Sequence, residues 1–163
     1  MNKIITLESA VEISGKLKLQ SKKIVITGGV FDILHIGHLK LLQESKKQGD
    51  SLIVLVENDE DVKKIKGKDR PINPQEERAE IIAALEFVDY VVTLPEMKSN
   101  KDWDDLVYKL MPDIITTTQD DSQAVHNQRQ AEKINARVVF VTKRIKNKST
   151  TNLAKIISEK FDK

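Results

Sequence analysis

Hydrophobic residues gather along this chain in short unbroken runs of strand length, and between the runs they recur at helical spacing. Within the runs they are continuous instead of alternating with polar residues, which is typical of strands that are covered on both faces. The runs predict strands at Lys23–Thr27, Ser51–Glu57, Val88–Leu94, Asp113–Thr117 and Arg137–Thr142.

The stretches around these runs predict helices. Gly49 suits the end of one helix, because glycine readily adopts the backbone conformation found there. Pro74 suits the first position of another, and Glu76 and Glu77 follow where acidic side chains favour the helix dipole. Helices are therefore expected between residues 39 and 49 and at 6–19, 74–85, 100–110, 122–135 and 150–161.

Strands that alternate with helices predict an α/β fold. We expect a Rossmann-like, doubly wound sheet of five parallel strands with helices on both faces, because right-handed crossovers place the helices there. No internal repeat, low-complexity tract or Pro/Gly/Ser-rich linker divides the sequence, so residues 1–163 are expected to form one domain, with residues 1–22 as an N-terminal helical extension. Ligands of such sheets bind beyond the carboxyl ends of the strands.

Composition narrows the classes of function. The 163 residues include 27 Lys and Arg against 25 Asp and Glu, a formal net charge of +2, and no cysteine. This near-balance argues against nucleic acid or an anionic membrane as the partner, since both usually need a basic excess. The lack of cysteine excludes disulfides and thiolate catalysis and fits a cytoplasmic protein. The longest apolar run, Leu52–Val56, is far shorter than the roughly 20 residues that span a bilayer.

The segment after the first predicted strand carries the candidate chemistry, Gly28-Gly29-Val30-Phe31-Asp32-Ile33-Leu34-His35-Ile36-Gly37-His38. It matches neither the dinucleotide fingerprint nor the P-loop. His35 and His38 lie on the same face of the first helical turn, where unpaired N–H groups and the helix dipole attract phosphate. Gly37 between them leaves room for the ligand. The segment therefore predicts a phosphate-binding site.

Two alternatives stand beside this interpretation. An isolated histidine is more often a structural residue, although here two of the three histidines of the chain cluster with three glycines. Asp32, His35 and His38 are also metal-ligand types, but they are one or two ligands short of a closed site.

Three motifs resemble one family. GVFDILHIGH resembles the HxGH signature of the nucleotidyltransferase superfamily, in its cytidylyltransferase-like branch. Lys66–Val92 strongly resembles the heptose 1-phosphate adenylyltransferase domain, and Arg144–Thr151 resembles an R-x-x-x-x-S-T-T motif of the same branch. The resemblance covers most of the chain from Lys23 onward. Glycerol-3-phosphate cytidylyltransferases and FAD synthetases of this branch are the nearest alternatives.

The resemblance implies a nucleotidyltransferase that moves AMP or CMP from ATP or CTP to a small phosphorylated acceptor such as a sugar phosphate. Pyrophosphate is released as the acceptor phosphate attacks the α-phosphorus in line, a reaction that needs positioning and charge neutralisation more than a strong base. Mg²⁺ would be held mainly by the nucleotide phosphates, with no dedicated protein ligands. A cytoplasmic homodimer is also implied, and the choice between adenine and cytosine stays open.

The resemblance also assigns roles to residues. The histidines would hold triphosphate oxygens, Asp32 would brace the loop, and Arg78 would grip the β- or γ-phosphate. The catalytic residues would be His35, His38, Lys68 and Arg144. The nucleotide-binding residues would be Gly28, Gly29, Val30, Phe31, Asp32, Gly37, Lys66, Arg78, Asp120, Ser149, Thr150 and Thr151.

Basic residues concentrate where such a site is expected. Residues 63–70 hold five basic residues against one acid, and four more lie at 143–148. Both clusters follow predicted strands, so a balanced total charge still leaves room for one compact triphosphate site. The alternatives are ordinary ones: solvated lysines, a surface position for Arg78, and helix capping by Ser149 or Thr150.

One loop departs from the family. The heptose-type enzymes carry a Lys-Gly-Gly-Asp-like loop and the glycerol-type a Gly-Asp-Asp-like loop, where this chain has Thr116-Thr117-Thr118-Gln119-Asp120-Asp121. Threonine cannot supply the charge with which lysine meets an anionic acceptor. A nucleotide-binding module without turnover therefore stays open, and the two basic clusters leave a weak nucleic-acid binder open as well. Trp103 belongs either to an acceptor pocket or to a helix start that it anchors.

Overall fold

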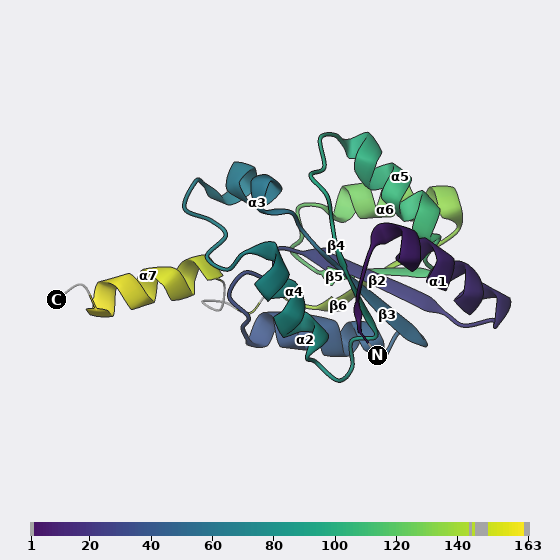
Figure 1. The fold of residues 1–163 in the computed structure, drawn as a ribbon, viewed down its shortest axis with the longest axis horizontal. Coiled ribbons are helices and arrows are strands. Elements are labelled where there is room, and N and C mark those ends of the chain that lie inside the picture. Colours follow the sequence, from purple (N-terminus) through teal and green to yellow (C-terminus); the bar gives the residue numbers. More distant parts are fainter. Residues whose placement is uncertain (1, 144, 146–149, 162–163) are drawn as a thin grey trace.

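The computed structural model describes residues 2–143, 145 and 150–161. Its centre is a sheet of six parallel strands in the order β1-β4-β3-β2-β5-β6 (Figure 1). The strands are β1 (Ile4–Ile5), β2 (Ile24–Gly29), β3 (Ser51–Val56), β4 (Tyr90–Thr93), β5 (Ile114–Thr118) and β6 (Arg137–Thr142).

Helices cover both faces of the sheet (Figure 1). The helices of the chain are α1 (Leu7–Leu19), α2 (Ile36–Lys46), α3 (Asp59–Lys66), α4 (Gln75–Ala83), α5 (Asn100–Leu110), α6 (Ala124–Ile134) and α7 (Thr150–Phe161), and α7 extends away from the sheet (Figure 1). Helices α1, α5 and α6 bury Ala10, Leu106 and Ala131 in one hydrophobic cluster, whereas α2 and α4 bury Leu42 and Ala79 in a second cluster on the other face. Within the described residues, no helix is long and apolar enough to cross a bilayer.

The Rossmann-like α/β prediction is confirmed, and each of the five predicted strands is present. The strand number was wrong by one, because β1 adds a sixth strand that pairs with β4 through Ile4 and Val91. A strand of two residues is too short to be recognised from the hydrophobic pattern of the sequence. The N-terminal residues therefore contribute an edge strand and a helix that packs on the sheet. Helix α3 was not among the predicted helices.

The topology fixes where a ligand can approach. Central strand β2 pairs with β3 on one side and with β5 on the other. The chain builds outward from β2 through β3 to β4, and then returns to place β5 and β6 on the opposite side. Successive connections thus leave β2 in opposite directions, which opens a crevice at the carboxyl ends of β2 and β5.

Candidate functional site

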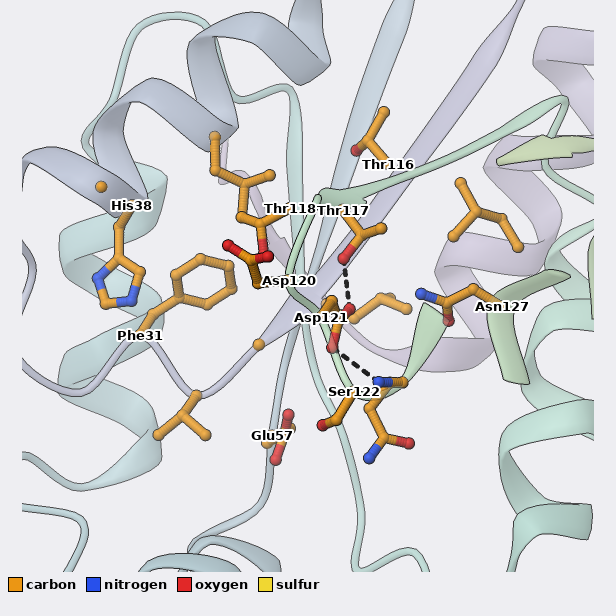
Figure 2. A pocket seen from close by; sticks show the side chains of 18 of the residues that line it. Phe31, His38, Glu57, Thr116, Thr117, Thr118, Asp120, Asp121, Ser122 and Asn127 are labelled. Carbon is orange, nitrogen blue, oxygen red and sulfur yellow. Dashed lines mark hydrogen bonds between the residues drawn. The ribbon is translucent and has the colours of Figure 1, made fainter. Parts of the chain in front are cut away.

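A cavity of about 520 Å³ lies at this edge of the sheet (Figure 2). Of the sixteen residues that the sequence assigned to catalysis or nucleotide binding, twelve line it: Gly28, Gly29, Val30, Phe31, Asp32, His35, Gly37, His38, Lys66, Asp120, Thr150 and Thr151. Lys68 and Arg78 do not line it. Arg144 and Ser149 lie outside the described residues. The structure therefore brings together segments from the beginning, middle and end of the chain.

The turn after β2 is shaped by a close approach of backbone and ring. Phe31 adopts a left-handed φ of 48°, and its ring atoms lie 3.1 Å from the position that a Cβ would take on Gly29. A side chain at residue 29 would press against this ring, so the ring would have to shift by a few tenths of an ångström to admit one. The same ring meets His38 edge-on, with centroids 5.2 Å apart.

The two histidines form a stacked pair at the N-terminus of α2. His35 is the N-cap residue, and its Nδ1 accepts a hydrogen bond from the backbone N–H of Gly37 at 3.1 Å. Its ring stacks on that of His38 with centroids 3.8 Å apart. Because Nδ1 of His35 is an acceptor, the neutral ring carries its proton on Nε2, which is then a donor.

Burial keeps both rings neutral. It lowers the pKa of His38 to about 3, with the neighbouring His35 acting in the same direction and the Ile33 carbonyl and Asp32 opposing it more weakly. Burial also lowers the pKa of His35. Near neutral pH the pair can therefore donate N–H groups to an anion without itself carrying charge.

Asp32 ties the turn after β2 to the segment before α4. Its carboxylate accepts hydrogen bonds from the backbone N–H groups of Ile72 and Asn73 at 2.9 Å and pairs with Arg70 at 2.5 Å. Burial would raise the pKa of Asp32, but these hydrogen bonds outweigh it and hold the pKa below its usual value. A carboxylate so fully engaged does not suit the alternative in which Asp32, His35 and His38 bind a metal.

Arg78 lies beneath the site, fully buried. Its guanidinium donates to the Val30 carbonyl, to the Glu57 carbonyl at 2.7 Å, to the Asn73 carbonyl at 3.0 Å and to the Asp59 carboxylate at 2.6 Å. The structure corrects the expected contact of Arg78 with phosphate, because its donors are directed at the protein. It joins α4 to the loops that follow β2 and β3.

The basic clusters contribute unequally. Lys66, at the end of α3, and Lys143, just after β6, line the cavity, whereas Lys68 lies exposed beyond α3. Thr150 begins α7 and donates its hydroxyl to the Ile33 carbonyl at 3.3 Å, which brings the end of the chain to the turn before α2. Among the described residues of these two clusters, Lys66 and Lys143 are thus the lysines that line the cavity.

Glu57 is a site residue that the sequence argument missed. It directly follows β3 and lines the cavity. Its carboxylate makes no hydrogen bond or ion pair with any residue that the structure describes. Burial raises the pKa of Glu57, Asp61 and Asp121 raise it further, and Lys66 and Arg78 oppose them. Its position directly after a predicted strand is the feature of the sequence that could have identified Glu57 as a site residue.

The opposite wall comes from α5, α6 and the turn after β5 (Figure 2). Trp103 both lines the cavity and packs on the hydrophobic cluster beneath. Thr117 donates its hydroxyl to Asp121, whose other oxygen accepts the Gln123 N–H at 2.9 Å. The wall also includes Asn100, His126, Asn127, Arg129 and Gln130, which sequence reasoning had not singled out.

Comparison with known proteins places this geometry in context. A family model described as cytidylyltransferase-like matches residues 26–160. The bifunctional protein HldE of Aliarcobacter butzleri is 40% identical over 157 residues, which cover 96% of this chain and 31% of that protein. The HldE of Helicobacter hepaticus is 38% identical over 156 residues, with coverages of 96% and 30%. The chain thus spans about a third of the length of these curated relatives.

Two solved structures are similar. The lipopolysaccharide core biosynthesis protein of Thermoplasma volcanium is 35% identical with a TM-score of 0.60, over 76% of this chain and 97% of that one. Pantoate-beta-alanine ligase of Francisella tularensis has a TM-score of 0.65 over 95% of this chain and 73% of its own, at 16% identity. The second similarity concerns the fold alone.

Proposed function

Because the chain belongs to the cytidylyltransferase-like family, we propose that it is a nucleotidyltransferase that moves AMP or CMP from a nucleoside triphosphate to a small phosphorylated acceptor. The observation that carries the proposal is the stacked pair His35 and His38 at the N-terminus of α2, inside the cavity at the crevice of the sheet. A sugar phosphate of the heptose 1-phosphate type is the acceptor that the sequence resemblance and the HldE relatives favour.

The site residues divide the work of an in-line transfer. An acceptor phosphate oxygen forms a bond to the α-phosphorus while the bond to the β-phosphate oxygen breaks, and pyrophosphate leaves with that oxygen. The neutral imidazoles and the free N–H groups at the start of α2 donate to phosphate oxygens, whereas Lys66 and Lys143 supply positive charge. No covalent enzyme intermediate is needed.

Buried contacts keep these groups in place. Arg78 fixes the Val30 and Glu57 carbonyls, and Asp32 fixes the segment before α4. Both are positioning residues in this proposal, because their polar atoms are directed at the protein. Transfer chemistry of this type depends chiefly on such positioning.

Mg²⁺ belongs to the proposal as a companion of the nucleotide. Among residues 2–143, 145 and 150–161, no group of three or more His, Asp or Glu side chains is arranged to hold a metal ion. Phosphate oxygens and water, the ligands that Mg²⁺ readily accepts, would hold it. When bound, the ion would neutralise phosphate charge. A cytoplasmic location and a homodimer complete the proposal.

A pyrophosphate-release screen tests the function. It crosses the four nucleoside triphosphates with heptose 1-phosphate, glycerol 3-phosphate, choline phosphate and flavin mononucleotide. We expect release with at least one pair that includes ATP or CTP. Thermal unfolding with each triphosphate runs in parallel, because a ligand of the folded state raises the melting temperature. Nucleotide binding without release from any pair would overturn transfer and support the binding-module alternative.

A further inference from the structure

Arg70 lies in the wall of the cavity, in the segment between α3 and α4. Its Nε donates to Oδ2 of Asp32 at 2.6 Å, and its Nη2 lies 2.5 Å from the same oxygen. Its Nη1 makes no hydrogen bond or ion pair with any residue that the structure describes. One edge of the guanidinium is thus held by Asp32, whereas the N–H groups of Nη1 are available for another acceptor.

Arg70 differs in this respect from Arg78, whose role is structural. Arg78 is fully buried, and its Nε, Nη1 and Nη2 all donate to oxygens of the protein. The side chain of Arg70 borders the cavity and is 14% exposed, whereas that of its partner Asp32 is completely covered. Arg70 is therefore the member of this ion pair that a ligand in the cavity can reach.

The contacts of Asp32 hold Arg70 in one place. The Asp32 carboxylate also accepts hydrogen bonds from the backbone N–H groups of Ile72 and Asn73, and the Asn73 side-chain amide donates to the Asp32 carbonyl at 2.9 Å. The guanidinium and its partner are therefore fixed to the same short segment of backbone. A donor that is oriented before the ligand arrives loses less conformational entropy when the ligand binds.

The cavity needs cations because its two imidazoles are neutral. Burial lowers the pKa of both His35 and His38, so neither ring carries a positive charge near neutral pH. Lys66 and Lys143 are exposed, and an ammonium is a point charge on a flexible stem. A guanidinium presents several N–H groups in one plane, which matches the oxygens of a phosphate. Arg70 thus combines positive charge with a fixed direction.

We propose that Arg70 is a phosphate-binding residue of the transfer reaction, in which Nη1 donates to a phosphate oxygen while Nε and Nη2 stay on Asp32. This inference rests on the proposed function and adds to it a residue that the sequence argument did not assign to the site. Both the triphosphate and the acceptor carry phosphate, so the shared chemistry is a phosphate group, and separate titrations distinguish the two sources.

Calorimetric titration of the full chain tests the proposal with ATP, CTP, inorganic pyrophosphate, heptose 1-phosphate and the two nucleosides without phosphate. Arg70→Gln keeps a donor for Asp32 but removes the charge and Nη1. We expect Kd for at least one phosphate ligand to rise at least about tenfold, because hydrogen bonds to charged groups are strong, and nucleoside binding to be unaffected. A rise for triphosphate and pyrophosphate assigns the phosphate to the nucleotide, and a rise for heptose 1-phosphate alone assigns it to the acceptor.

Asp32→Asn separates phosphate binding from a purely structural role. It removes the ion pair and disturbs more protein contacts than Arg70→Gln, but it leaves the guanidinium in the chain. We therefore expect the larger fall in melting temperature from Asp32→Asn and the larger rise in Kd from Arg70→Gln. If either variant does not fold, Arg70→Lys replaces it, and loss of the second guanidinium edge should still weaken phosphate binding by about threefold or more.

Arg137→Gln is the matched control, because Arg137 is exposed at the start of β6 and does not line the cavity. An exposed charge outside the site is screened, so every Kd should stay within about twofold of wild type. Unchanged phosphate affinity in Arg70→Gln, or an equal rise in Kd in Asp32→Asn, overturns the inference even if pyrophosphate is released. Weaker phosphate binding by Arg70→Gln without release from any pair supports the inference and overturns transfer alone. A wild-type chain that binds none of these ligands overturns both.

Discussion

Burial changes what a histidine contributes at residue scale. A pKa of about 3 means that His38 is neutral at physiological pH, so its N–H group is available but its charge is not. The negative charge of a triphosphate must then be met by other groups. Among the described residues, Lys66 and Lys143 are the lysines that line the cavity, and the dipole of α2 adds a partial positive charge at its N-terminus. Hydrogen bonding to the phosphates and neutralisation of their charge are therefore divided between different groups, the first to the histidines and the second chiefly to the lysines.

His38→Asn tests this division. Asparagine keeps a polar side chain but cannot reproduce the stacked ring or the imidazole N–H, so kcat for pyrophosphate release should fall about 100-fold or more. Circular dichroism and thermal unfolding should show that the variant is folded. Turnover within a few-fold of wild type would mean that the histidine pair is structural.

The same residue makes stability depend on pH. The unfolded chain binds a proton on His38 below its ordinary pKa of 6.5, whereas the folded chain resists protonation until the pH approaches about 3. Its contribution to the free energy of unfolding is therefore fully present above pH 6.5 and is lost as the pH falls, by about 3 kcal/mol at pH 4 and by more as the pH approaches 3. Urea unfolding of wild type and His38→Asn between pH 7 and pH 4 should give a smaller loss in the variant. Parallel curves would contradict the shifted pKa.

The residues of the site show which features could be predicted from the sequence and which could not. The motif around His35 and His38 predicted which side chains meet at a helix start, because three-residue spacing fixes a shared face. Arg78 does not have the phosphate contact that was expected, because its side chain is buried. The burial of this side chain depends on what packs around α4, which the spacing of residues in the sequence does not reveal. Glu57 was missed for the converse reason. In the sequence it is only a polar residue at the end of a strand, and the fold places it in the cavity with Asp121 nearby.

Among the helices and strands, the longer elements were predicted more accurately than the shorter ones. Helix Asn100–Leu110 and strand Arg137–Thr142 have the predicted bounds, since each carries a full periodic or continuous pattern. Strand β1 has two residues and acquires its character from pairing with β4. Helix α3 was hidden by its lysines, although Asn58 caps it by accepting a hydrogen bond from the Glu60 N–H. Short elements are determined by their tertiary partners.

Arg78 is the clearest link between elements, and its removal should be costly. Arg78→Met leaves buried carbonyls of Val30, Asn73 and Glu57 without their donor, so we expect a loss of about 3 kcal/mol in the free energy of unfolding. Arg129→Met is the matched control, because Arg129 is half exposed and its pair with Asp104 should contribute less than about 1 kcal/mol. Urea unfolding measures both. Equal losses would show that burial of the Arg78 contacts is unimportant.

At the scale of the whole molecule, the N-terminal segment is the part whose role changed most. The family match begins at residue 26, which by itself would suit an appendage before the domain. The structure instead pairs Ile4 and Ile5 with Val91 and Val92 at the edge of the sheet. Helix α1 buries Ala10 in the cluster shared with α5 and α6. The segment covers surface that the rest of the chain would otherwise expose.

Removal of residues 1–22 tests whether this covering is required. Without β1 the fully buried Val91 and Val92 would lie on an exposed sheet edge, and such an edge readily pairs with other chains. We expect a lower melting temperature and concentration-dependent association in light scattering. Ala10→Asp should reproduce the loss of stability within the full chain, because it places a charge in the core. Leu19→Asp is its control, since Leu19 is 89% exposed. A truncated chain that stays monomeric and equally stable would restore the appendage interpretation, because the sheet would then not need its sixth strand.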